Sequence, residues 1–296
     1  MKKLLYHILA VATVSIWGTT FVSTKVLLHH GLTPDVIFTL RFLMAYGVLW
    51  LLRPRLGMWC RNLRDELRMV GLGITGGSLY FLTENAALCY APAANVSLLV
   101  CTTPLLTILL MRLAYRHSER LSRYTVGGSL LALAGVALVV LNGHFALKLN
   151  PRGDLLALSA SLLWALYTLL LRSVEGRYRN LLITRKVFGY GLLTILPYLA
   201  WHQPELSLET FRAPAVWGNL LFLGLIASLV CYATWNAVVK NLGASFSSNY
   251  LYLNPLAATL AAALVLQEVI TPTAAFGACM ILAGIALARK KDGAKR

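Results

Sequence analysis

Long apolar runs alternate with short polar segments along the whole chain. Within each run Leu, Ala, Val, Ile and aromatic residues stand at most positions, and most charges fall between the runs. A bilayer core about 30 Å thick needs about 20 helical residues, so runs of this length predict transmembrane helices. The runs lie near residues 4–28, 34–52, 68–90, 93–114, 124–141, 154–174, 181–200, 215–239, 244–267 and 272–289. We therefore expect an all-α integral membrane protein with ten transmembrane helices.

The composition supports a membrane protein and excludes other classes. Of the 296 residues, 58% are hydrophobic and only 13% are charged. Soluble domains are about half apolar and about a quarter charged, so this composition differs clearly from theirs. The five cysteines form no C-x-x-C pair, and the histidines form no H-E-x-x-H motif, so we expect no metal site. A P-loop G-x-x-x-x-G-K-[ST] is also absent from the sequence, so we expect neither ATP hydrolysis nor a cofactor.

The distribution of Lys and Arg predicts the orientation. Of 27 basic residues, 22 fall in the termini and the loops of one side, and three fall on the other: Lys148, Arg152 and Arg212. The remaining two, Lys25 and Arg41, fall inside predicted spans. Because positive loops stay in the cytoplasm, both termini should be cytoplasmic, in a multi-pass protein of the cytoplasmic membrane. The net charge of +16 then reflects the membrane topology, and the basic loops are expected to contact anionic lipid. We expect no nucleic-acid partner.

The two halves of the chain match each other. The segment 133–138 reads L-A-G-V-A-L, and 282–287 reads L-A-G-I-A-L at an offset of 149; Asn85-Ala86 and Pro104 recur at an offset of 151. We therefore divide the chain into 1–145 and 146–296. Each half holds five spans, an odd number, so the second must enter the membrane from the opposite side. This predicts an inverted repeat, an architecture common among secondary transporters.

The repeated motifs resemble the EamA domain of the drug/metabolite transporter superfamily. The resemblance rests on Trp17 and Trp164, the A-L-x-Y-x-x-A-A segment 87–94, Pro104 and Pro255, and the E-(x8)-G-(x6)-G pattern in both halves. It covers nearly the whole chain. It implies a ten-helix transporter of small organic metabolites, often amino acids or drugs and often moved outward.

Two charges inside predicted spans are candidates for transport, because a charge in hydrocarbon is costly. Arg41 and Glu84 lie at similar depths, about 10 Å from the outer ends of their spans. They could form an ion pair, either functional or purely structural. If Glu84 is only intermittently paired, it could carry a coupling proton. If Arg41 faces the cavity, an anionic or zwitterionic substrate is favoured; if it is paired, a neutral compound is as plausible.

The fourth and ninth spans carry matched polar faces next to Pro104 and Pro255, which we regard as hinges. Each proline frees the backbone carbonyl one turn earlier, at Val100 and Leu251. That carbonyl must bond to water, substrate or a neighbouring side chain. The polar candidates for substrate binding here are Ser97, Thr103, Asn249, Tyr252 and Asn254.

Aromatic and amide side chains complete the set of substrate-binding candidates. Aromatic rings in spans either stack on a substrate or simply pack, and buried amides either bind substrate or join helices. The candidates are Trp17, Tyr80, Asn85, Trp164, Tyr167 and Trp235.

These features predict a secondary transporter that moves, and most often exports, small organic metabolites such as amino acids by alternating access. The alternatives are an exporter of drugs or lipophilic compounds and a membrane enzyme acting on lipid-linked substrates. We expect a small-molecule substrate, the lipid bilayer as surroundings, and a monomer, because two fused halves need no second chain.

Overall fold

The structure is a computed structural model that describes residues 2–57, 59–91, 93–115, 122–141, 150–204, 207, 209–266 and 271–288. Every regular element in these ranges is a helix. The first half contains α1 (Lys2–His29), α2 (Pro34–Leu52), α3 (Leu63–Gly73), η1 (Ile74–Ser78), α4 (Leu79–Tyr90), α5 (Ala93–Val100), α6 (Thr103–Ala114) and α7 (Arg123–Leu141). The second contains α8 (Pro151–Val174), α9 (Asn180–His202), η2 (Thr210–Arg212), α10 (Pro214–Leu221), η3 (Phe222–Val230), α11 (Cys231–Leu242), α12 (Ala244–Ser248), η4 (Asn249–Tyr252), α13 (Leu253–Leu266) and α14 (Pro272–Ala288).

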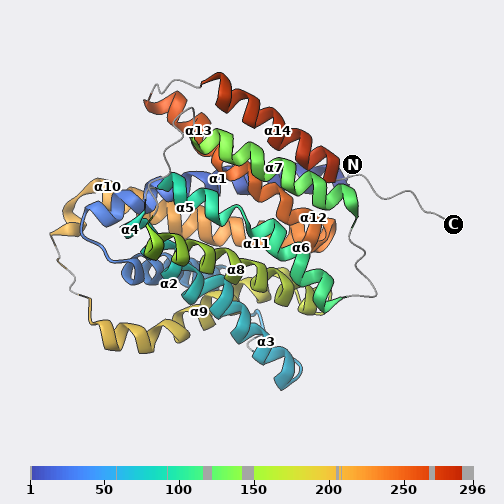
Figure 1. Ribbon diagram of the computed structural model, residues 1–296. Helices are drawn as coiled ribbons and strands as arrows, with labels where there is room; N and C mark the ends of the chain where they lie inside the picture. The colour runs from blue at the N-terminus through green and yellow to red at the C-terminus, as the bar shows by residue number, and fades with distance from the viewer. Residues whose placement is uncertain are drawn as a thin grey trace.

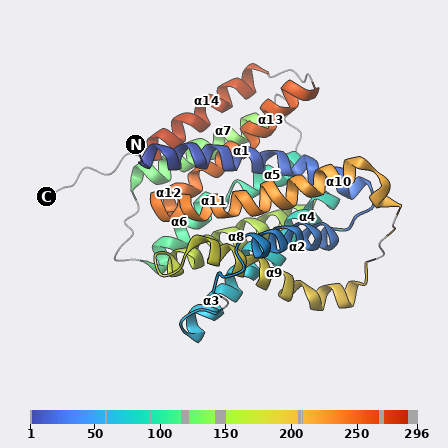
Figure 2. The same cartoon turned by 180° about the vertical axis from the view of Figure 1, so that it is seen from behind.

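The helices form a bundle in which α8 and α11 lie centrally and α7 and α14 lie together at one edge (Figures 1 and 2). The N-terminal end of α3 projects from the opposite edge. Helices α7 and α14 are equivalent in the two halves, and they run antiparallel: Gly128 lies against Gly284, and Gly135 lies against Gly277.

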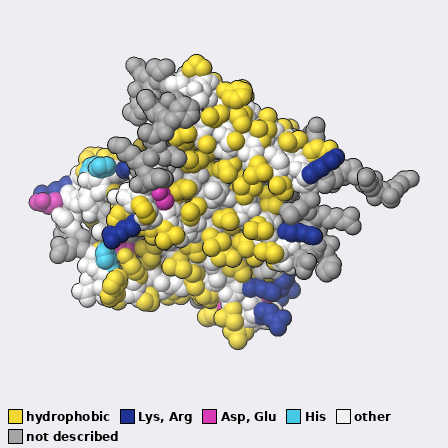
Figure 3. Space-filling model, viewed as in Figure 1, with side chains coloured by type: hydrophobic (Ala, Val, Ile, Leu, Met, Phe, Trp, Pro, Cys, Tyr) yellow, Lys and Arg dark blue, Asp and Glu magenta, His cyan; other side chains and the backbone are white. Residues whose placement is uncertain are grey.

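The surface is that of a membrane protein. Hydrophobic side chains cover most of the face in Figure 3, and the Lys and Arg side chains lie mainly towards its margins. Six helices among the described residues are long and apolar enough to cross a membrane: Lys3–His29, Pro34–Leu52, Asn95–Ala114, Arg123–Leu141, Pro151–Val174 and Pro214–Leu242. The expectation of an all-α multi-pass protein is thus confirmed, while ten spans and the orientation remain predictions.

Two equivalent helical stretches are broken near the predicted hinges. In the first half a turn at Cys101 and Thr102 separates α5 from α6, and in the second half the 3-10 segment η4 separates α12 from α13. Pro104 and Pro255 lie in the first turns of the helices that follow, where a missing N–H costs little. The prolines therefore begin new helices rather than bend continuous ones.

Side chains satisfy both carbonyls that the prolines leave free. The Thr103 hydroxyl donates to the Val100 carbonyl at 2.7 Å, and the Cys101 thiol donates to the Leu251 carbonyl at 3.7 Å. The second contact joins the two breaks to each other across the halves. In this conformation neighbouring side chains bond to both carbonyls, which is one of the three alternatives that the sequence left open.

The other equivalent pair of helices contains π-helical turns. Segment η1 divides α3 from α4, and η3 divides α10 from α11. At the repeat offset of 151, residues 74–78 correspond to 225–229, so the two π-helical segments overlap. Tyr232, two residues after η3 in α11, donates its hydroxyl hydrogen to the Gly76 carbonyl of η1. Such bulges are frequent at functional sites.

Candidate functional site

A small cavity lies between the two halves at the centre of the bundle. Its volume is about 40 Å³, which is room for water but not for an organic metabolite. The helices must therefore separate before a substrate can enter. The lining residues are Trp17, Thr20, Phe21, Arg41, Tyr80, Phe81, Glu84, Val100, Cys101, Thr103, Trp164, Tyr232, Leu251 and Asn254.

Arg41 is the cation of this cavity. Its side chain, on α2, is 2% exposed, and its Nε donates to Ser228 Oγ at 2.9 Å. The guanidinium carbon lies 4.3 Å from the centre of the Phe81 ring, which favours a cation–π contact. The two terminal nitrogens have no hydrogen-bond partner among the described residues. A buried guanidinium with no ion-pair partner is costly, so its terminal nitrogens could bind an anion that entered the cavity.

Glu84 is the acid of the same cavity. It is 8% exposed, and its Oε1 accepts a hydrogen bond of 2.5 Å from Tyr80, one turn earlier on α4. The predicted Arg41–Glu84 ion pair does not form, although the structure describes both residues. Arg41 is instead held towards η3 of the second half, and Glu84 is held along its own helix. Two opposite charges thus line one cavity without contacting each other.

Aromatic rings form the walls between these charges. The equivalent Trp17 and Trp164 meet edge to face at 5.2 Å, and the Tyr80 ring lies 4.9 Å from Trp164. The Trp17 indole donates to the Ala227 carbonyl of η3 at 2.9 Å, which fixes its orientation. The walls are therefore rigid, apolar surfaces suited to the hydrocarbon part of a ligand.

The structure brings together seven of the predicted substrate-binding residues: Trp17, Arg41, Tyr80, Glu84, Thr103, Trp164 and Asn254.

Six others do not line the cavity. They are Asn85, Ser97, Tyr167, Trp235, Asn249 and Tyr252. Three of these are occupied in helix contacts: Asn85 donates to the Pro34 carbonyl, Tyr167 to Asn236, and Asn249 accepts from Ser129. Ser97, Trp235 and Tyr252 are buried, and the Trp235 ring packs 5.3 Å from Trp17.

Two residues that matter here were missed by sequence reasoning. Tyr232 lines the cavity, and Ser228 holds Arg41. The repeat offset of 151 is a signal for Tyr232, since it places Tyr232 at the position of Phe81. Of the described residues, no three His, Cys, Asp or Glu side chains are grouped so as to hold a metal ion.

The bundle and its central cavity define a multi-pass helical membrane protein with a small cavity between two related halves. Residues 4–141 and 151–289 each match the EamA-like transporter family. The chain belongs to this family, as its motifs indicated.

Several curated proteins are similar over almost their whole length. A "Probable terminal-alkyne amino-acid exporter" from Streptantibioticus cattleyicolor is 28% identical, with 97% of this chain and 94% of the relative covered. A "Probable amino-acid metabolite efflux pump" from Salmonella typhimurium is 29% identical, with 94% and 92% covered. A solved crystal structure superposes with a TM-score of 0.72 at 21% identity, covering 97% of this chain and 96% of the other, which shows the shared fold. The family and these relatives point to a transporter rather than an enzyme.

Proposed function

We propose that this protein is a secondary transporter that exports small zwitterionic metabolites of the amino-acid class across the cytoplasmic membrane. The observation that carries the proposal is that Arg41 and Glu84, two groups of opposite charge, line one cavity without forming an ion pair with each other. A substrate carboxylate would bind the free nitrogens of Arg41, and its ammonium group would bind Glu84. The names of two relatives, an amino-acid exporter and an amino-acid metabolite efflux pump, support the same class.

The mechanism we propose is alternating access between two inverted repeats, residues 1–145 and 146–296, with ten spans and both termini cytoplasmic. The antiparallel packing of α7 and α14 supports the inversion, and the Lys and Arg distribution supports the orientation. The small cavity supports an occluded conformation, with the breaks before Pro104 and Pro255 as the points that flex. One chain contains both halves, so a monomer is sufficient.

Glu84 also suits proton coupling, because a carboxylate that bonds either a proton or a substrate ammonium exchanges one for the other. Glu84→Gln should then abolish efflux driven by a proton gradient but preserve exchange of substrate for substrate. Normal proton-driven efflux in this variant would exclude the coupling role.

The test of the function is efflux from proteoliposomes loaded with three matched compounds: an apolar amino acid, the amine that lacks its carboxylate, and the acid that lacks its amine. Wild type should export the amino acid. Arg41→Gln should reduce its apparent affinity at least ~10-fold, since a hydrogen bond to a charged group contributes about 1.5–3 kcal/mol. Lys25→Gln is the matched control, because Lys25 is a cation that does not line this cavity. Equal export of all three compounds would contradict the proposal.

An exporter of lipophilic compounds is the second candidate, favoured by the aromatic walls of the cavity. For a lipophilic cation, efflux should depend on Glu84 and be insensitive to Arg41→Gln. Efflux of that kind, with no amino-acid efflux, would replace the first proposal by the second.

A further inference from the structure

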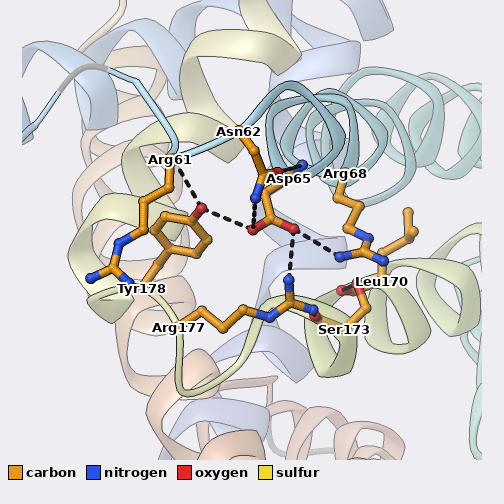
Figure 4. Close-up of polar contacts among 8 residues, drawn as sticks. All are labelled: Arg61, Asn62, Asp65, Arg68, Leu170, Ser173, Arg177 and Tyr178. Carbon is orange, nitrogen blue, oxygen red and sulfur yellow. Dashed lines mark hydrogen bonds and ion pairs between the residues drawn. The ribbon is translucent and has the colours of Figure 1, made fainter.

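A buried carboxylate joins the two halves at the end of the bundle that carries most of the Lys and Arg (Figure 4). Asp65, in the first turn of α3, is 2% exposed. Its Oδ1 accepts from Arg68 and from Arg177, each at 2.8 Å, and its Oδ2 accepts from the Tyr178 hydroxyl at 2.9 Å. Arg68 is on the same helix as Asp65, whereas Arg177 and Tyr178 belong to the second half, between α8 and α9.

The next residue makes a second connection of the same kind. Glu66 forms an ion pair with Lys186 of α9 and accepts a hydrogen bond from the Tyr190 hydroxyl. Its other oxygen accepts from the backbone N–H of Cys60 at 2.7 Å. Two adjacent carboxylates of the first half are therefore bound by cations and hydroxyls of the second.

Both carboxylates remain charged at physiological pH. Burial alone would raise the pKa of each. For Asp65, the hydrogen bonds from Tyr178 and Arg68 and the charge of Arg177 hold the pKa below its ordinary value. For Glu66, the hydrogen bonds from Lys186 and Tyr190 lower the pKa to about 2. The contacts are thus present throughout the range in which the cell operates.

Among the described residues, the opposite end of the bundle has no equivalent of these pairs. The repeat offset of 151 places Val216 at the position of Asp65, and the offset of 147 places His30 at the position of Arg177. At that end the structure records a 3.3 Å hydrogen bond from Thr210 to the His30 carbonyl. The cross-half ion pair recorded there joins His202 to Asp35 at 3.0 Å and needs a protonated imidazole. Among the described residues, the cross-half pairs of permanently charged groups all lie at the Lys- and Arg-rich end.

We propose that Asp65 and Glu66, with Arg177, Tyr178 and Lys186, form a latch that closes the cytoplasmic end and makes closure on that side the resting conformation. Two inverted repeats of identical sequence would reach their inward-open and outward-open shapes at equal free energy, by exchanging conformations. A set of ion pairs at one end removes this equality. In an exporter the latch opens before substrate enters from the cytoplasm. The inference rests on the orientation and the alternating access proposed above.

The test compares Arg177→Gln with Arg68→Gln. Each substitution removes one 2.8 Å ion pair to the same Oδ1 of Asp65, but only the Arg177 pair crosses between the halves. The readout is the rate at which a membrane-impermeant maleimide alkylates Cys60 in inside-out vesicles, with the exposed Cys89 and Cys279 replaced by serine. Cys60 is half-buried beside Glu66, so opening of the latch exposes it.

We expect Arg177→Gln to increase the alkylation rate about 3-fold over Arg68→Gln, because a partly exposed ion pair contributes modestly to the closed conformation. The double variant R177Q/K186Q should react faster than Arg177→Gln, since it loses both cross-half pairs. Removing a nearby cation favours the neutral thiol of Cys60 over its thiolate, which is the form that reacts with maleimide. An electrostatic effect alone would therefore slow the alkylation. Equal rates in the two single variants would overturn the latch.

This readout requires no substrate and so separates the two proposals. Faster alkylation of Cys60 in Arg177→Gln, in a protein that exports no amino acid, would support the latch and contradict the proposed substrate. Amino-acid efflux without the difference in alkylation would support the substrate and contradict the latch.

Discussion

Gly128 of α7 and Gly284 of α14 lie face to face, and each takes up the space that a side chain on the other helix would need. A Cβ on Gly128 would lie 2.4 Å from the Gly284 carbonyl oxygen, and a Cβ on Gly284 would lie 2.5 Å from the Gly128 carbonyl oxygen. The reciprocity follows from the pseudo-symmetry of the two halves. This contact lets the last helices of the repeats approach closely, as small residues do in membrane helix packing.

Gly128→Ala should therefore destabilise the protein. Overpacking a tight contact costs about 1–3 kcal/mol, which outweighs the better helix propensity of alanine. We expect the midpoint of thermal unfolding in detergent to fall by about 3–9 °C, at about 3 °C per kcal/mol. The matched control is Gly127→Ala, since a Cβ there would meet no atom within 4 Å. An equal loss in both variants would exclude this explanation.

Ser228→Ala should weaken substrate binding without unfolding the protein. The serine Oγ accepts from Arg41 Nε, so its loss leaves the guanidinium held by Phe81 alone and less well aimed at a carboxylate. We expect the KM for amino-acid efflux to rise about 10-fold, equivalent to about 1.4 kcal/mol, with little change in maximal rate.

Ser247→Ala is the control for this variant. Ser247 is a buried serine whose hydroxyl has no hydrogen-bond partner among the described residues. A similar rise in KM in Ser247→Ala would mean that loss of a buried hydroxyl, not loss of support for Arg41, explains the effect.

Pro104→Ala and Pro255→Ala should slow transport while leaving stability unchanged or increased. Alanine at position 104 or 255 has a backbone N–H that can donate to the carbonyl of Val100 or Leu251. This hydrogen bond favours a continuous helix over the break. Initial efflux rates and thermal midpoints, measured together, check this. Pro197→Ala is the control, because Pro197 lies inside α9 and outside the cavity. Faster transport in Pro104→Ala would refute the hinge.

Glu175 should make stability depend on pH. It follows the last residue of α8, and burial, outweighing the charges of Arg172 and Lys240, raises its pKa to about 7. The carboxyl group of Glu175 has an ordinary pKa of about 4.3 in the unfolded chain. The folded protein therefore binds the Glu175 proton more tightly than the unfolded chain does. Stability should therefore fall as pH rises from about 4.5 to 7 and stay reduced above it.

Glu175→Gln should remove that dependence. We expect the variant to unfold about 3 °C above wild type at pH 8, and at the same temperature as wild type at pH 5. Thermal unfolding at the two pH values measures this. A gain of equal size at both would show that packing, and not ionisation, is responsible.

The sequence predicted the helices better than it predicted the contacts between their side chains. The run at 34–52 coincides with α2. The repeat identified Trp17 and Trp164 as equivalent residues, and the structure adds that their rings are in contact. The prediction of an ion pair between Arg41 and Glu84 was wrong. Equal depth fixes the height of the two side chains in the membrane, but it does not fix the directions in which they point.

The π-helical turns explain other misses. We assigned side chains to helix faces by assuming 3.6 residues per turn. Where a π-helical turn holds an extra residue, the side chains beyond it point in other directions than this spacing predicts. Trp235, at the position equivalent to Glu84, is fully buried and lies outside the cavity. Ser228 lies inside η3, where α-helical periodicity does not apply.

The matched π-helical turns also limit how this chain tolerates changes in length. A residue deleted from an α-helix rotates everything beyond it by about 100°, which would carry Glu84 or Tyr232 away from the centre. A π-helical turn is wider than an α-helical one, so it can lose a residue and remain a closed, hydrogen-bonded turn. Segments η1 and η3 are therefore the places where a one-residue deletion preserves the helix while re-aiming its inner face. Such a deletion in a duplicated copy of the gene would change which side chains of the helix face the cavity, without substituting any of the remaining residues.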